Sequence, residues 1–214
     1  MIVLNLKTYQ ASFDNALLFT DIANEVASET GVRVVICPPA PFLNNATERY
    51  SDVFAQHVDA NDAGPYTGSM PASLLKTIHV KGSLVNHSER KIPDVKECVE
   101  SLHSNGLESI VCAATAKEAV SYADFSPAFI AIEPPDLIGG TVSVSEADPG
   151  IVLNSVKAVK EVNHRISVLC GAGIGKKQDV EKAIELGSEG ILLASAFIKA
   201  RDPKIFLADL ASVF

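Results

Sequence analysis

The sequence predicts a (β/α)8 barrel, because short β-branched apolar runs alternate with longer amphipathic stretches along the whole chain. Each such pair is typical of a strand followed by a helix in a parallel sheet. Eight apolar runs of this kind occur, more than an open doubly wound sheet usually contains. A barrel of roughly 200 residues is near the lower size limit. We therefore expect an α/β fold with a single barrel domain over residues 1–214.

Each expected strand is a short apolar run bounded by polar or turn-forming residues. The eight are Ile2–Leu6, Val32–Cys37, Val53–His57, Lys81–Val85, Ser109–Cys112, Ala128–Ile132, Ser167–Cys170 and Gly190–Leu193. Between them, apolar residues recur at the spacing of a helix with one buried face. The residues that mark two such faces are Leu18, Ile22 and Val26, then Val95, Val99 and Leu102.

Local signals also predict where helices begin and end. Asp148-Pro149 and Asp202-Pro203 each place a capping carboxylate before a proline, which is typical of a first turn. Gly106 and Gly187 follow helical patterns, where a left-handed stop is expected. No proline-rich, glycine- and serine-rich or strongly charged segment divides the chain, which again favours one domain.

Charge and composition disfavour several classes of protein. The net charge is −8 and the basic residues are scattered, so no surface for nucleic acid is expected. The apolar runs are far shorter than the ~20 residues that cross a membrane, and the amino terminus lacks a signal-peptide pattern. We expect a cytoplasmic protein with no membrane partner. The four cysteines show no CxxC spacing and are expected to be buried free thiols rather than metal ligands.

Polar residues follow three of the expected strands at the end where barrels carry their active sites. Lys7 follows the first strand, His87 the fourth and Glu133 the sixth. An amine, an imidazole and a carboxylate at one shared mouth suit proton transfer. Glu133 follows the apolar run 129–132 and precedes two prolines, so partial desolvation should raise its pKa towards that of a useful base.

The environment of His87 predicts an uncharged ring. The polar segment after the fourth strand is expected to begin a short helix, and a helix start disfavours a cation. If one ring nitrogen accepts a backbone N–H, the neutral ring can donate a hydrogen bond from the other. We therefore expect His87 to polarise a carbonyl oxygen.

Small residues at three other strand ends predict an anion site. Gly139-Gly140 follows Glu133, Gly171-Ala172-Gly173 ends the seventh strand, and Ala194-Ser195 ends the eighth at an expected helix start. Unobstructed backbone N–H groups in these loops of a barrel frequently bind phosphate. The segment Gly171–Gly175 is also similar to a dinucleotide loop, but its glycine spacing does not fit G-x-G-x-x-G.

These residues together resemble the triosephosphate isomerase family, in particular its short archaeal type. The resemblance rests on Asn5-Leu6-Lys7, on Asn86-His87-Ser88-Glu89-Arg90, and on the segment from Ile132-Glu133-Pro134 to Ile138-Gly139. It implies a TIM barrel that interconverts dihydroxyacetone phosphate and D-glyceraldehyde 3-phosphate through an enediolate, in glycolysis and gluconeogenesis. It also implies that neither a metal nor an organic cofactor takes part.

The resemblance assigns a role to each site residue. Glu133 would move the proton between carbons, His87 would polarise and protonate the oxygens, Lys7 would supply positive charge, and Asn5 would orient the substrate. Ser88 and Glu89 would support these groups, and 134–140 would form a lid. The residues that would bind substrate are Asn5, Lys7, Ile138, Gly139, Gly171, Gly173, Ala194 and Ser195.

The loop Ala63–Met70 resembles the segment that this family inserts into a neighbouring subunit. It is too long for a simple turn between a strand and a helix, and Pro65, Tyr66 and Met70 would be costly to leave as an exposed protrusion, so we expect it to insert into a partner. The resemblance implies that Tyr66, Thr67 and Gly68 contact the partner in a homodimer or a homotetramer. The sequence departs from the family at Ser69, where a Glu is usual, at Ala194-Ser195, where Gly-Gly is usual, and in a lid without Trp.

Two alternatives remain open at this point. Another phosphate-binding barrel, such as an aldose–ketose isomerase of amino-acid biosynthesis, would share the expected anion site but gives no reason for Asn5, Lys7 and His87. A catalytically inactive barrel that serves as a scaffold predicts the loss of a proton-transfer group. An assay for dihydroxyacetone phosphate formation separates these alternatives.

Overall fold

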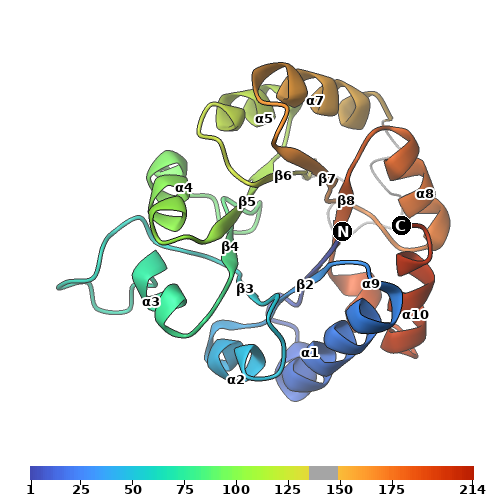
Figure 1. The fold of residues 1–214 in the computed structure, drawn as a ribbon, viewed down its shortest axis with the longest axis horizontal. Coiled ribbons are helices and arrows are strands. Elements are labelled where there is room, and N and C mark those ends of the chain that lie inside the picture. The colour runs from blue at the N-terminus through green and yellow to red at the C-terminus, as the bar shows by residue number, and fades with distance from the viewer. Residues whose placement is uncertain (135–148) are drawn as a thin grey trace.

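Eight parallel strands form a central ring with helices around it, as this computed structural model shows (Figure 1). The structure describes residues 1–134 and 149–214. The strands follow one another around the ring, and a bridge between Ile36 and Val53 joins the two ends of the order, β2 and β3. The strands are β1 (Ile2–Asn5), β2 (Val34–Cys37), β3 (Phe54–Ala55), β4 (Gly82–Val85), β5 (Glu108–Ala113), β6 (Phe129–Ile132), β7 (Ser167–Cys170) and β8 (Gly190–Leu193).

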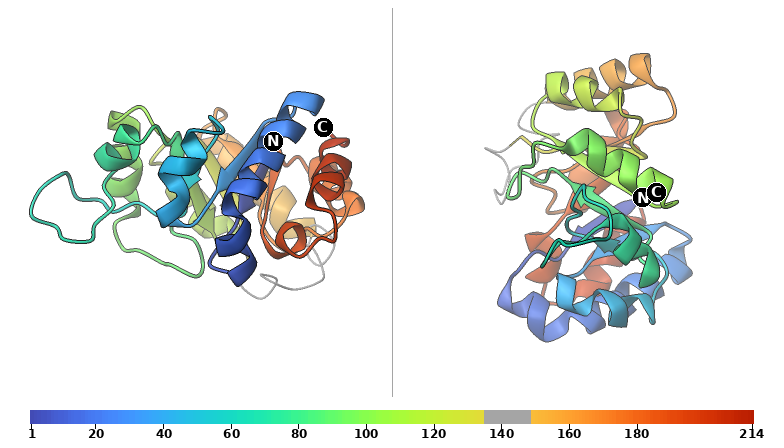
Figure 2. Two further views of the ribbon diagram at one scale, coloured as in Figure 1. Left: turned by 90° about the horizontal axis from the view of Figure 1, so that it is seen from below. Right: turned by 90° about the vertical axis from the view of Figure 1, so that its left-hand side faces the viewer.

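The helices cover the outside of this ring, as the two side views also show (Figure 2). None of the helices in the described ranges is long and apolar enough to cross a membrane. They are α1 (Gln10–Thr30), η1 (Ala40–Phe42), α2 (Leu43–Thr47), α3 (Ala72–Thr77), α4 (Val95–Ser104), α5 (Ala116–Ala123), α7 (Pro149–Val162), α8 (Lys177–Glu185), α9 (Ser195–Ile198) and α10 (Pro203–Ala211).

Alternation along the strands separates two apolar layers. Val3 faces the inside of the barrel, where it packs with Leu84 and Leu169, whereas Ile2 and Leu4 pack against the helices. Successive side chains of a strand point to opposite faces, and both faces of a parallel sheet are buried in this fold. All four cysteines are buried and unbridged, as the sequence predicts.

Several predicted helix boundaries are confirmed. The Asp202 carboxylate accepts a hydrogen bond from the N–H of Ile205 at 3.1 Å and caps α10. Gly106 and Gly187 follow α4 and α8 with φ of 73° and 92°, the left-handed region that glycine adopts without a steric penalty. Pro149 begins α7, while Asp148 lies outside the described residues.

Two expectations about the elements are wrong in detail. β3 spans only Phe54–Ala55 rather than Val53–His57. The next residue, Gln56, donates its side-chain amide to Cys37 O of β2 at 2.9 Å. Leu18 is 54% exposed rather than part of the buried face of α1. The buried stripe runs instead through Phe19, Ile22, Ala23 and Val26, beyond a break in helical geometry at Asn15.

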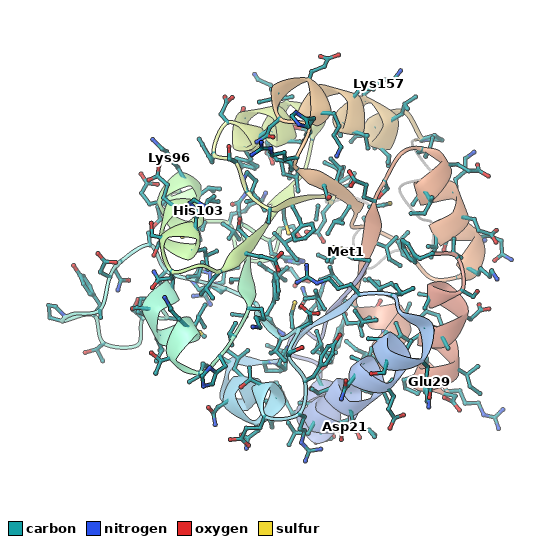
Figure 3. The ribbon with its side chains drawn as sticks, viewed as in Figure 1. Met1, Asp21, Glu29, Lys96, His103 and Lys157 are labelled. Carbon is teal, nitrogen blue, oxygen red and sulfur yellow. The ribbon has the colours of Figure 1, made fainter. Side chains whose placement is uncertain are left out.

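Arg33 closes the amino-terminal end of the barrel. Its guanidinium forms ion pairs with Asp52 at 2.7 Å and Glu108, and lies 5.9 Å and 5.8 Å from the ring centroids of Phe54 and Phe129. Burial works against the charge, but the hydrogen bonds of Glu108 and Asp52 raise the pKa of Arg33 above its usual value. Other charged side chains, such as those labelled on the rim of the molecule, lie on the outer helices (Figure 3).

Replacing Arg33 with Met should therefore lower the free energy of unfolding by about 1–2 kcal/mol, because two neighbouring carboxylates lose their shared cation and two rings lose a cation–π contact. Urea denaturation measures this change. Lys204, which pairs with Glu25 and Glu29 on the surface, provides a matched control. Lys204→Met should have a smaller effect, and equal losses in the two variants would show that Arg33 is an ordinary surface charge.

Candidate active site

The first strand places a lysine at the carboxyl-terminal rim of the barrel. Lys7 lies two residues beyond β1 in a left-handed conformation with φ of 48°. Its N–H donates to Asn5 Oδ1 at 3.0 Å, and its carbonyl oxygen accepts from the Gln56 amide at 3.1 Å. Its amine forms an ion pair of 2.6 Å with Glu89. Because its backbone and its amine are both held, the cation has a defined position at the rim.

His87 lies two residues beyond β4, and the structure corrects the helix expected to begin there. The chain forms a turn at residues 88–89, and the next helix, α4, begins only at Val95. The backbone N–H that was expected from a helix start comes instead from this turn, because the N–H of Glu89 donates to His87 Nδ1 at 3.2 Å. A neutral ring that accepts at Nδ1 carries its proton on Nε2. Ser88 lies in the same turn.

Glu133 follows β6 and is only 2% exposed. Its N–H donates to Ala113 O at 2.8 Å, which continues the ladder of β5 and β6 by one residue. Its Oε1 lies 3.4 Å from His87 Nε2. Both His87 Nε2 and Glu133 Oε2 are buried without a hydrogen-bond partner among the residues that the structure describes. Leaving buried polar atoms unpaired is costly, so this pair indicates a place for a bound polar group.

The environment of Glu133 includes a thiol and a glycine. Burial, together with the negative charge of Glu133, raises the pKa of the Cys112 thiol well above its usual value, so the thiol stays protonated beside the carboxylate. On the other side, a Cβ added at Gly171 would lie 2.5 Å from Glu133 Cγ and 3.1 Å from Ile132 O. The carboxylate therefore occupies space that only glycine leaves open.

A cavity of about 410 Å³ opens beside these groups. Lys7, His87 and Glu133 line it, together with the segments 171–176 and 192–196, which follow β7 and end β8. Gly173 has φ of 72°, and α9 begins at Ser195, so the first N–H groups of that helix have no acceptor within it. The cavity thus combines the three polar strand-end groups with the backbone segments expected to bind an anion.

A second cavity, of about 610 Å³, is also lined by Lys7 and His87. Asn5, Gln56 and Arg90 belong to this second cavity, and Asn5 does not line the first. The Asn5 side chain instead accepts the N–H of Lys7. The geometry therefore connects Asn5 with the position of Lys7.

Two groups of expected residues lie apart from this cluster. Tyr66, Thr67 and Gly68 lie in an exposed loop between β3 and α3 that protrudes from the barrel (Figures 1 and 2). Ile138 and Gly139, with most of the expected lid, lie outside the described residues. Gln56 was not among the residues expected at the site, yet its side-chain amide holds the carbonyl groups of Lys7 and Cys37. Its position at the end of an expected strand was the signal that could have found it.

The fold and the site define an enzyme of the (β/α)8 barrel class whose polar groups suit proton transfer. The family model described as triosephosphate isomerase matches residues 1–213. The triosephosphate isomerase of Methanothermus fervidus is 45% identical over 214 residues, covering 98% of this chain and 96% of that protein. That of Archaeoglobus fulgidus is 44% identical over 219 residues, covering 100% and 97%.

The solved structure of triosephosphate isomerase from Bartonella henselae has the same fold, with a TM-score of 0.74 at 20% identity over 99% of this chain and 97% of that one. The chain belongs to the triosephosphate isomerase family. The resemblance that the sequence motifs indicated is therefore confirmed at the level of family and fold.

Gly171→Ala should reduce kcat by about 10²-fold, because the added methyl group displaces the Glu133 carboxylate, and displacements of about 1 Å cost this much. Steady-state kinetics measure the effect. Gly175 lies in the same segment, and a Cβ there would meet its neighbours only at 3.9 Å. Gly175→Ala should change kcat by less than about threefold. Equal effects of the two substitutions would contradict the steric argument.

Proposed function

We propose that this protein catalyses the interconversion of dihydroxyacetone phosphate and D-glyceraldehyde 3-phosphate. The observation that carries the proposal is the unpartnered pair of buried atoms, His87 Nε2 and Glu133 Oε2, on the wall of one cavity. A carbonyl oxygen beside an acidic C–H group satisfies both atoms at once. The pairing of a carboxylate base with a neutral imidazole is the established example of such chemistry in this enzyme family.

The reaction begins with Glu133 as the base. Its carboxylate removes a proton from the carbon next to the carbonyl, while the Nε2–H of His87 donates a hydrogen bond to the carbonyl oxygen. The electrons of the broken C–H bond move into a carbon–carbon double bond, and the carbonyl becomes an enediolate oxygen. Lys7 stabilises this negative charge, since its amine is held at the same rim.

The second half of the reaction returns the proton to the other carbon. His87 gives its Nε2 proton to one oxygen and takes the proton of the other, and Glu133 then protonates the neighbouring carbon. The separation of 3.4 Å between the two side chains supports this sequence, because a substrate fragment of two carbons and two oxygens can contact both. The buried wall limits the access of water to the intermediate.

The phosphate of the substrate binds to backbone N–H groups around Gly171, Gly173, Ala194 and Ser195. The support for this assignment is that all four residues line the same cavity as Glu133. The net charge of −8 repels a dianion at long range, so the local field of Lys7 and these dipoles must outweigh it. We place the reaction in the cytoplasm, where four buried free thiols are stable.

The active unit is a homodimer or a dimer of dimers, in which the protruding loop of one copy enters the second cavity of another. Hydrogen bonds join the two ends of this loop. Asp59 accepts from Met70 N–H at 2.7 Å and Ser69 Oγ at 3.1 Å, and contacts His57 Nε2 at 2.9 Å. Burial disfavours the Asp59 carboxylate, but these hydrogen bonds hold its pKa below the usual value. Tyr66, at the tip, is 54% exposed.

Glu133→Gln should reduce kcat by about three powers of ten, within the range that general-base catalysis contributes, while the affinity for inorganic phosphate stays the same. A coupled assay for dihydroxyacetone phosphate and a calorimetric titration with phosphate measure the two quantities. Glu100→Gln, on the surface of α4, serves as the control. A loss of tenfold or less in Glu133→Gln would exclude this residue as the base.

Shortening the loop within residues 64–69 should give a monomer with low activity, since Lys7 and His87 border the cavity that the partner loop is proposed to fill. Light scattering gives the mass, and the same coupled assay gives the activity. A monomer that retains most of the activity would show that the loop only joins the subunits and does not complete the site.

A further inference from the structure

Asn86 directly precedes His87. Its backbone has a conformation that favours glycine, and both polar atoms of its side-chain amide form hydrogen bonds. Its φ is 60°, in the left-handed region, and the residue is only 3% exposed. Its amide Nδ2 donates to Cys112 O at 3.2 Å and to Tyr122 Oη at 3.0 Å, and its Oδ1 accepts from Ile92 N–H at 3.2 Å. Glycine would fit this backbone with less strain, so the value of Asn86 lies in these three hydrogen bonds.

These bonds connect the turn that carries His87 to two neighbouring elements. Cys112 belongs to β5 and Tyr122 to α5, whereas the Ile92 N–H lies at the far end of the segment that follows His87. One side chain thus ties both ends of the segment 86–92 to the barrel. A segment held at both ends has little freedom to rotate the imidazole.

The connection also relates His87 to Glu133. Asn86 binds the carbonyl group of Cys112, and the thiol of the same Cys112 lies beside the Glu133 carboxylate. The imidazole and the carboxylate are therefore positioned from one residue of β5. We propose that Asn86 is a positioning residue that sets the 3.4 Å approach of His87 to Glu133, a role that rests on the isomerase reaction proposed above.

The variant Asn86→Gly tests this role, because glycine adopts the left-handed backbone readily and lacks the side chain that makes the three hydrogen bonds. We expect kcat to fall about 10- to 100-fold, as for a small misplacement of a catalytic group, with KM and the Kd of inorganic phosphate within about threefold. Tyr122→Phe removes one of the two acceptors and should reduce kcat by less than about fivefold. Ser126→Gly, at another left-handed position with φ of 54°, should leave kcat unchanged.

A spectroscopic measurement separates this role from the reaction itself. The ¹⁵N shifts of the His87 ring report which nitrogen carries the proton, and Asn86→Gly should move them from one tautomer towards a mixture. A change in these shifts supports the role of Asn86 even if the protein shows no isomerase activity, which would refute only the proposed reaction. Unchanged shifts, a kcat within about twofold, or an equal loss of phosphate affinity would each overturn the positioning role.

Discussion

The closed register of eight short parallel strands is the constraint on which the whole site depends. Ile132 pairs with Ala113 on one side and with Cys170 on the other, so Glu133 and Gly171 begin their loops at the same height. β1 and β4 are not neighbours in the sheet, yet the ring brings Lys7 and His87 to one rim. Because no strand within the described residues exceeds six residues, little of the chain separates the apolar core from these polar groups.

The segments that follow β1 and β4, which carry Lys7 and His87, share one backbone feature. Beyond β1 and β4 the chain passes through the left-handed region, at Lys7 and at Asn86. Glu133, in contrast, continues the ladder of β6 without such a turn. The strain of such a conformation persists only where neighbouring groups hold it. An amide side chain supplies the support in each case: Gln56 binds the carbonyl of Lys7, and Asn86 binds that of Cys112.

The sequence was sufficient to predict where all eight strands lie, because each falls on a short, mainly apolar run between helical stretches. The end of α4 at Gly106 and the start of α10 at Asp202 could also be predicted, since the signals for both are local. The short β3 and the exposed Leu18 could not be, because both depend on which neighbour a side chain meets. For the same reason, the sequence predicted that Lys7, His87 and Glu133 share one rim. It predicted neither the turn that follows His87 nor the close approach of the Glu133 side chain to Gly171.

Lys7 and His87 line both cavities. Any molecule that orders these side chains from one side also changes the free energy of filling the other side. Such linkage is reciprocal: if a second chain in the larger cavity improves the binding of a small anion in the smaller one, the anion strengthens the association of the chains by the same factor. Under that condition, the concentration of the anion would set how far the chains associate.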